Sequence, residues 1–221
     1  MYFLADMRSE IMAACTHCGE KDKISAYSSI NVAETPELRE KVMDGSLFMW
    51  ECPHCGSMNL IQSQTLYHDP VEKLMIWSTG NSREFETQIA TAYSKVEEMA
   101  DYTARFTADI GSLIEKVKIF ASGLDDIVIE LCKYVTKMEL RDKDKAHADE
   151  INAAPFKFLK LDGADNEITL AYPVGGEMQM VAIGFNVYED CRGIVSRNPE
   201  VSKAAAGFTR VDAVWLSRFF R

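Results

Sequence analysis

Two matching cysteine motifs constrain this chain more than any other feature of its sequence. Residues 15–19 (CTHCG) and 52–56 (CPHCG) both follow the pattern C-x-x-C-G, and 33 residues separate the two cysteine pairs. A two-residue spacer lets the backbone turn tightly enough for both thiols to point at one ion, so each pair supplies half of a tetrahedron. The following glycine allows the backbone to turn away at low cost. The pattern predicts a four-cysteine metal site, whose ligands are Cys15, Cys18, Cys52 and Cys55.

Zinc is the metal that this pattern favours, in a structural site of the zinc-ribbon type. Iron is the alternative, because four thiolates also hold iron in rubredoxin-like sites and sulfur ligation alone does not separate the two metals. Two disulfides are a weaker alternative, because a reducing compartment keeps thiols free. His17 and His54 lie inside the motifs. Since four thiolates complete the metal's shell, we expect both histidines to be exposed spacers.

Composition narrows the class of protein. The 221 residues are 47% apolar and carry a formal net charge of −10, so the chain can bury a core. It has no run of about 18 apolar residues that would span a membrane, and its first residues (MYFLADMRSE) lack the long apolar region of a secretory signal. We expect a soluble, cytoplasmic protein. The acidic charge disfavours nucleic acid as a partner, because phosphate binding needs a basic surface.

Residue patterns predict an α+β fold in three parts. Residues 1–80 read as short strands around the cysteine motifs, forming a small zinc-ribbon-like β domain. Residues 81–150 have helical periodicity, with Asn81 and Glu84 as a capping box at the first helix start. Residues 151–221 read as a compact α+β unit that begins with a hairpin and ends with a helix from Asp212 to Phe220.

Several short motifs accompany the two cysteine pairs in the first third of the chain: SINV (29–32), PELREK (36–41), DGSLF (44–48), YHD (67–69) and LMI (74–76). In this order they resemble the CpXC-domain family of bacteria and archaea. The resemblance spans about residues 8–78; weaker likeness to longer members extends through residues 116–131. It implies metal binding at the four cysteines and leaves the activity open, because no activity is established for the family. The first motif, CTHC, lacks the proline that the family name implies.

No catalytic motif is recognisable in the linear sequence, which leaves enzymatic activity uncertain and favours a non-enzyme. The sequence contains no G-x-S-x-G, H-E-x-x-H or phosphate-loop pattern. His68 and Asp69 are the one other candidate pair, as a general base or metal ligand. Neighbouring residues on a strand point to opposite faces. We therefore expect Asp69 to make a local turn hydrogen bond before Pro70 instead of orienting His68.

These observations favour a zinc-binding, non-catalytic module for protein interaction or scaffolding, with a protein partner or a second copy as its ligand. The first alternative is a nucleic-acid-binding ribbon that uses Tyr27, Trp50 and Tyr67 as aromatic contacts; it rests on analogy with other ribbons. The second alternative is rubredoxin-like electron transfer through iron.

Overall fold

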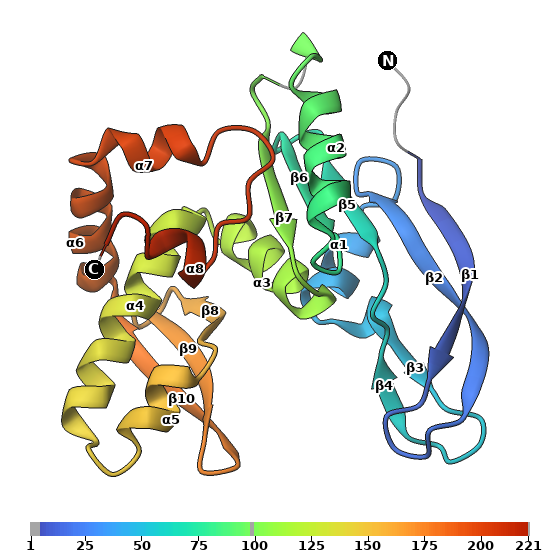
Figure 1. Cartoon of the computed structure of the whole chain (residues 1–221), viewed down its shortest axis with the longest axis horizontal. Helices are drawn as coiled ribbons and strands as arrows, with labels where there is room; N and C mark the ends of the chain where they lie inside the picture. Colours follow the sequence, from blue (N-terminus) through green and yellow to red (C-terminus); the bar gives the residue numbers. More distant parts are fainter. Residues whose placement is uncertain (1–4, 98–99, 221) are drawn as a thin grey trace. The chain divides into compact units, whose positions relative to one another are not determined.

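A computed structural model describes residues 5–97 and 100–220 of the chain. The chain forms two compact units (Figure 1). Unit 1 consists of Met1–Val117 and Ala206–Arg210, and unit 2 of Lys118–Ala205 and Val211–Arg221. Strands dominate the first part of the sequence, and helices with a smaller sheet follow. The predicted α+β class is confirmed.

Within the described part of unit 1, five strands form one mixed sheet in the order β1-β2-β5-β6-β7. The β1–β2 and β5–β6 pairs are antiparallel, whereas β2–β5 and β6–β7 are parallel. Every residue of β5 is buried, which is typical of a central strand covered on both faces. The strand bounds are β1 Met7–Ala14, β2 Lys21–Asn31, β5 Thr65–Asp69, β6 Leu74–Ser78 and β7 Thr103–Thr107.

Two hairpins carry the cysteine motifs. The first motif is the turn between β1 and β2, and the second is the turn between the short strands β3 (Met49–Glu51) and β4 (Met58–Leu60). A small core lies between the hairpins and includes Trp50 and Ile61 together with Cys15 and Cys52. The short strands predicted around the cysteine motifs are therefore present, with the four cysteines clustered at their turns.

Helices contact both faces of the five-stranded sheet. Arg39 of α1 (Glu37–Met43) pairs with Asp69 of β5 on one face. Trp77 of β6 contacts Phe85 of α2 (Arg83–Tyr93) edge-on, with ring centroids 5.2 Å apart. In the sheet register Trp77 lies opposite Leu66, three positions from Asp69, so α1 and α2 lie on opposite faces. Unit 1 also contains a short 3-10 turn, η1 (Ser46–Phe48), and the part of α3 (Ile110–Ala121) up to Val117.

The start of α2 corrects one prediction. Ser82, not Asn81, is the N-cap residue, and its hydroxyl accepts a hydrogen bond from the backbone N–H of Phe85. Asn81 has a φ of 64°, a left-handed conformation that asparagine tolerates better than most residues. Its side chain accepts a hydrogen bond from Arg210 instead. The residue that holds Asn81 in this way lies 129 positions later in the chain.

Unit 2 packs helices against a three-stranded antiparallel sheet of order β10-β9-β8, within the described residues. Its core joins Phe158, Ile168 and Leu170 of the sheet to Ile129 and Cys132 of α4. The last helix, α8, is shorter than the predicted helix from Asp212 to Phe220, although Asp212 does cap it. The bounds are α4 Asp126–Lys143, α5 Ala148–Ala153, β8 Lys157–Asp162, β9 Glu167–Val174, β10 Glu177–Gly184, α6 Phe185–Ser196, α7 Pro199–Ala204 and α8 Ala213–Leu216.

The described helices include none that is long and apolar enough to cross a membrane. The three-part division of the sequence at residues 80 and 150 stays a prediction about separable domains. The two compact units meet in sequence within α3, between Val117 and Lys118.

Candidate metal centre

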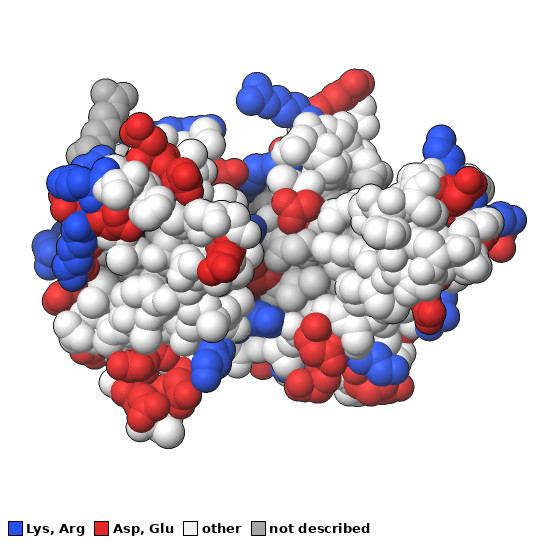
Figure 2. All heavy atoms as spheres, turned by 90° about the horizontal axis from the view of Figure 1, so that it is seen from below, with Lys and Arg blue, Asp and Glu red and all other residues white. Residues whose placement is uncertain are grey.

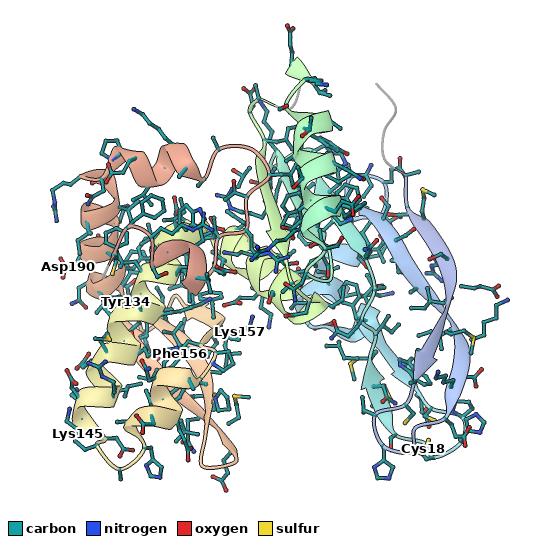
Figure 3. The ribbon with its side chains drawn as sticks, in the orientation of Figure 1. Cys18, Tyr134, Lys145, Phe156, Lys157 and Asp190 are labelled. Carbon is teal, nitrogen blue, oxygen red and sulfur yellow. The ribbon has the colours of Figure 1, made fainter. Side chains whose placement is uncertain are left out.

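The structure brings all four motif cysteines to one place. Their sulfur atoms lie within 4.8 Å of one another, the single such group of possible metal ligands found in residues 5–97 and 100–220. Figure 3 shows Cys18 at the hairpin ends, where further sulfur atoms gather. All six cysteines of the chain are free thiols. Two pairs that are far apart in sequence thus form one cluster because each sits at the turn of a hairpin.

The sulfur spacing fits a tetrahedral metal. Two distances cross between the motifs: 3.6 Å from Cys15 Sγ to Cys55 Sγ, and 3.7 Å from Cys18 Sγ to Cys52 Sγ. A zinc–sulfur bond of about 2.3 Å gives a tetrahedron whose edge is about 3.8 Å. The four residues therefore match a divalent metal held by four thiolates, and an iron–thiolate site has the same donor set.

The two cysteine turns have the same backbone geometry. Gly19 N donates to Cys15 O at 2.9 Å, and Gly56 N donates to Cys52 O at 2.8 Å. The two glycines have φ angles of 77° and 72°, a region that residues with a Cβ rarely adopt. The predicted role of these glycines in turning the chain is confirmed.

Asn59 joins the second motif to the first, and the sequence pattern did not reveal it. Its side chain is 3% exposed. Its Oδ1 accepts from Thr16 N at 2.8 Å and from Thr16 Oγ1 at 2.9 Å, while its Nδ2 donates to Cys15 Sγ at 3.4 Å and to Ser57 O at 2.8 Å. Such groups orient metal ligands from outside the ligand set. The available signal was a polar residue between the apolar residues of a short strand.

Hydrogen bonds to sulfur stabilise the thiolate form of Cys15. Its pKa is lowered to about 6, first by the Cys18 backbone N–H and, against the opposing effect of burial, also by the His17 backbone N–H and the Asn59 side chain. The pKa of Cys55 is also lowered, chiefly by hydrogen bonds from Ser57. Metals bind thiolates and not thiols. The local structure therefore prepares these two sulfurs for a cation.

The motif histidines lie outside the sulfur cluster. His17 and His54 are both exposed, as predicted. His54 Nε2 lies 3.8 Å from Asp22 Oδ2, a contact between two exposed groups that contributes little.

His68 and Asp69 form hydrogen bonds with different partners. His68 Nε2 lies 3.1 Å from the Tyr102 hydroxyl, and burial lowers the His68 pKa. Asp69 pairs with Arg39 and accepts hydrogen bonds from the backbone N–H groups of Val71 and Glu72 at 3.2 and 3.1 Å. The Asp69 carboxylate thus forms the turn hydrogen bonds that the sequence indicated.

Two of the three aromatic residues proposed for nucleic-acid contact are buried. Trp50 is 9% exposed and Tyr67 is 1% exposed, so neither can stack on a base, and the prediction that they do so is wrong. Burial also raises the Tyr67 pKa above its ordinary value. On the face drawn in Figure 2, Lys and Arg side chains lie interspersed with Asp and Glu. That face offers no broad basic surface for phosphates.

The β3–β4 hairpin exposes apolar side chains next to the cysteine cluster. In its register Met49 lies opposite Leu60, and Glu51 lies opposite Met58, so these four residues share one face. Met58 is 57% exposed, Met49 39% and Leu60 37%. Methionine side chains adapt to varied partner surfaces. We call these four residues the hairpin face.

Comparison with known proteins adds one finding. A model of the CpXC protein family matches residues 13–133, more than half of the 221 residues. No curated protein and no solved structure matches the chain.

Proposed function

The chain belongs to the CpXC family, and we propose that it is a cytoplasmic zinc-binding module that docks other proteins without catalysis. The observation that carries the proposal is the convergence of four cysteine sulfurs at two hairpin turns. Zinc bound there would be held by Cys15, Cys18, Cys52 and Cys55 and would supply folding free energy to the hairpins, which bury few apolar residues of their own.

The exposed hairpin face supports protein binding as the function of the cysteine-bearing hairpins. It places Met49, Met58 and Leu60 on a two-stranded element that the metal would fix in position. Contiguous exposed apolar side chains mark interaction sites more often than singly scattered ones do. Rubredoxin-like electron transfer is the competing use of the same thiolates.

The metal is tested by elemental analysis of the full chain, purified without added metal. We expect about one zinc per chain and no visible absorption band. Stoichiometric iron with visible absorption would contradict the zinc assignment and favour electron transfer.

The docking role is tested by affinity capture from the native cell. The bait is the full chain, and the matched control carries Met58→Glu and Leu60→Glu, which place charge on the hairpin face without touching a cysteine. We expect a specific partner to be retained by the wild type and lost by the control, while both proteins keep their metal. Capture that is equal for both proteins, or no specific capture, would contradict the docking role.

A further inference from the structure

A short segment from near the end of the sequence packs on unit 1. Residues 206–210 (AGFTR) belong to that unit, although the residues on both sides of them belong to unit 2. The segment lies beside β7, the last strand in the sheet order (Figure 1). Thr209 forms a parallel bridge with Arg105: Thr209 N donates to Ala104 O at 3.3 Å, and Phe106 N donates to Thr209 O at 3.1 Å. The segment therefore extends the sheet through main-chain hydrogen bonds.

Phe208 is the first of two side chains by which the segment packs against the rest of unit 1. Its ring stacks on Phe106 with centroids 4.8 Å apart and contacts Tyr93 edge-on at 5.0 Å, and Trp77 lies at 6.3 Å. Aromatic pairs at these separations stabilise beyond their buried area. Three rings from α2, β6 and β7 thus form a slot for one aromatic side chain.

The second such side chain is Arg210. Its guanidinium pairs with Glu86 and donates to Asn81 Oδ1 and, at 3.1 Å, to Thr79 Oγ1. The Thr79 hydroxyl donates in turn to Glu86 Oε1 at 2.6 Å. The ion pair is largely shielded from solvent, with 21% of the arginine side chain and 16% of the glutamate exposed. Three acceptors therefore surround one cation in a site of low exposure.

The two pockets are spaced for an extended peptide. Phe208 and Arg210 are two residues apart, the spacing that places both side chains on one face of a strand, while Thr209 supplies the main-chain bridge. Strand addition with pockets for alternate side chains is a known mode of peptide recognition. An open depression of about 500 Å³, lined by Tyr93, Ala104 and Gly207 among others, lies beside Phe208.

The groove lies inside the range that the family model matches, whereas its occupant lies outside that range. The residues that form both pockets lie between Trp77 and Phe106, inside the range that the family model matches, whereas residues 206–210 lie outside that range. The receptor surface therefore lies in the part of the chain that the family model matches.

We propose that this groove is a docking site for an extended segment of a partner protein, in which an aromatic residue is followed two positions later by arginine. Residues 206–210 fill the groove in the free chain and compete with the partner. The acidic chain and the Glu86 carboxylate both select a basic ligand. The groove, at β7, is separate from the hairpin face on β3 and β4.

Fluorescence anisotropy with a labelled peptide tests the proposal. The peptide copies residues 204–212 (AAAGFTRVD), and the receptor is the full chain carrying Phe208→Ala and Arg210→Ala, which empties both pockets. We expect this variant to bind the peptide at least tenfold more tightly than the wild type does. The same peptide with alanine in place of phenylalanine and arginine should not bind. Adding Glu86→Gln to the variant should weaken binding at least tenfold.

Three results would overturn the proposal. The first is a variant with a native circular dichroism spectrum that does not bind the peptide. The second is a dimer of the wild type whose amount rises with concentration and which the variant does not form, since the occupant would then be a second copy. The third result is measured on the wild type and is decisive even where the variant fails to fold. If hydrogen exchange shows that the Thr209 amide exchanges only through global unfolding, the segment never leaves its groove. Faster, local opening of that amide would support the proposal.

Discussion

Replacing Asn59 by alanine should weaken metal binding although no ligand is lost. The side chain makes four hydrogen bonds, two of them to Thr16 in the first motif and one to the Cys15 sulfur. A hydrogen bond to a charged group contributes about 1.5–3 kcal/mol. The bond to the Cys15 thiolate alone therefore indicates a loss of about 2 kcal/mol, which corresponds to about 30-fold in affinity. This agrees with the 10–100-fold, roughly, that outer groups contribute at other metal sites.

The assay is competition for zinc between the full chain and a chromophoric chelator at neutral pH. We expect the zinc affinity of Asn59→Ala to be about 30-fold lower than that of the wild type. His54→Ala is the matched control, because His54 lies inside a motif but is exposed and outside the sulfur cluster. We expect this control to bind zinc as the wild type does.

An Asn59→Ala affinity within twofold of the wild type would refute the reasoning, because it would mean that the bond to Cys15 does not stabilise the thiolate. A loss of the same size in His54→Ala would refute it differently, by showing that any change in a motif weakens the site.

Three further outcomes follow from the structure. Cys52→Ser should abolish zinc binding and lower the melting temperature, since metal binding provides much of the hairpins' folding free energy; unchanged zinc content by elemental analysis would show that the ligand assignment is wrong. Arg39→Ala should lower the free energy of unfolding by about 3 kcal/mol, measured in urea, because the Asp69 carboxylate then stays buried without its partner cation. Asp69→Asn should lower it by only about 1 kcal/mol. A larger loss in Asp69→Asn than in Arg39→Ala would contradict the idea that the ion pair compensates a buried charge. Because burial lowers the His68 pKa, the unfolded chain binds the proton more readily, so stability should be fully present above about pH 6.5 and fall as the pH drops below it. Thermal melts of His68→Gln should show a smaller fall than the wild type between pH 7.5 and 5.5, and equal falls would count against it.

Much of the candidate site could be predicted from sequence because its determinants are local. A two-residue spacer and a trailing glycine define each cysteine turn within five residues, and both turns have the predicted geometry. Pairing the two turns needed only the assumption that a metal requires four ligands. Asn59 could not be found in this way, since its bond to Cys15 joins residues 44 positions apart and an asparagine in a short strand has no distinguishing pattern.

The same limit explains the errors in the fold. Asn81 and Ser82 are both good capping residues, and Arg210, far along the chain, holds the Asn81 side chain elsewhere. The segment 206–210 has too few residues for any periodicity, and the partners of Phe208 and Arg210 lie more than 100 residues earlier. Local rules predicted turns and caps well where one candidate stood alone, and they failed where a long-range contact chose among several.

The two ends of strand β2 depend on different stabilising interactions, the sheet core at one end and the cysteine cluster at the other. Its first five residues, next to Cys18, are exposed or half-buried, whereas Ser29, Ile30 and Asn31 at its other end are buried in the five-stranded sheet. The buried end is stabilised by packing that needs no metal. The cysteine end has only the small core around Trp50 and Ile61, too little to hold two hairpins alone. Removing the metal should therefore loosen the hairpins, and the hairpin face with them, while the sheet and the Phe208 groove at its opposite edge persist.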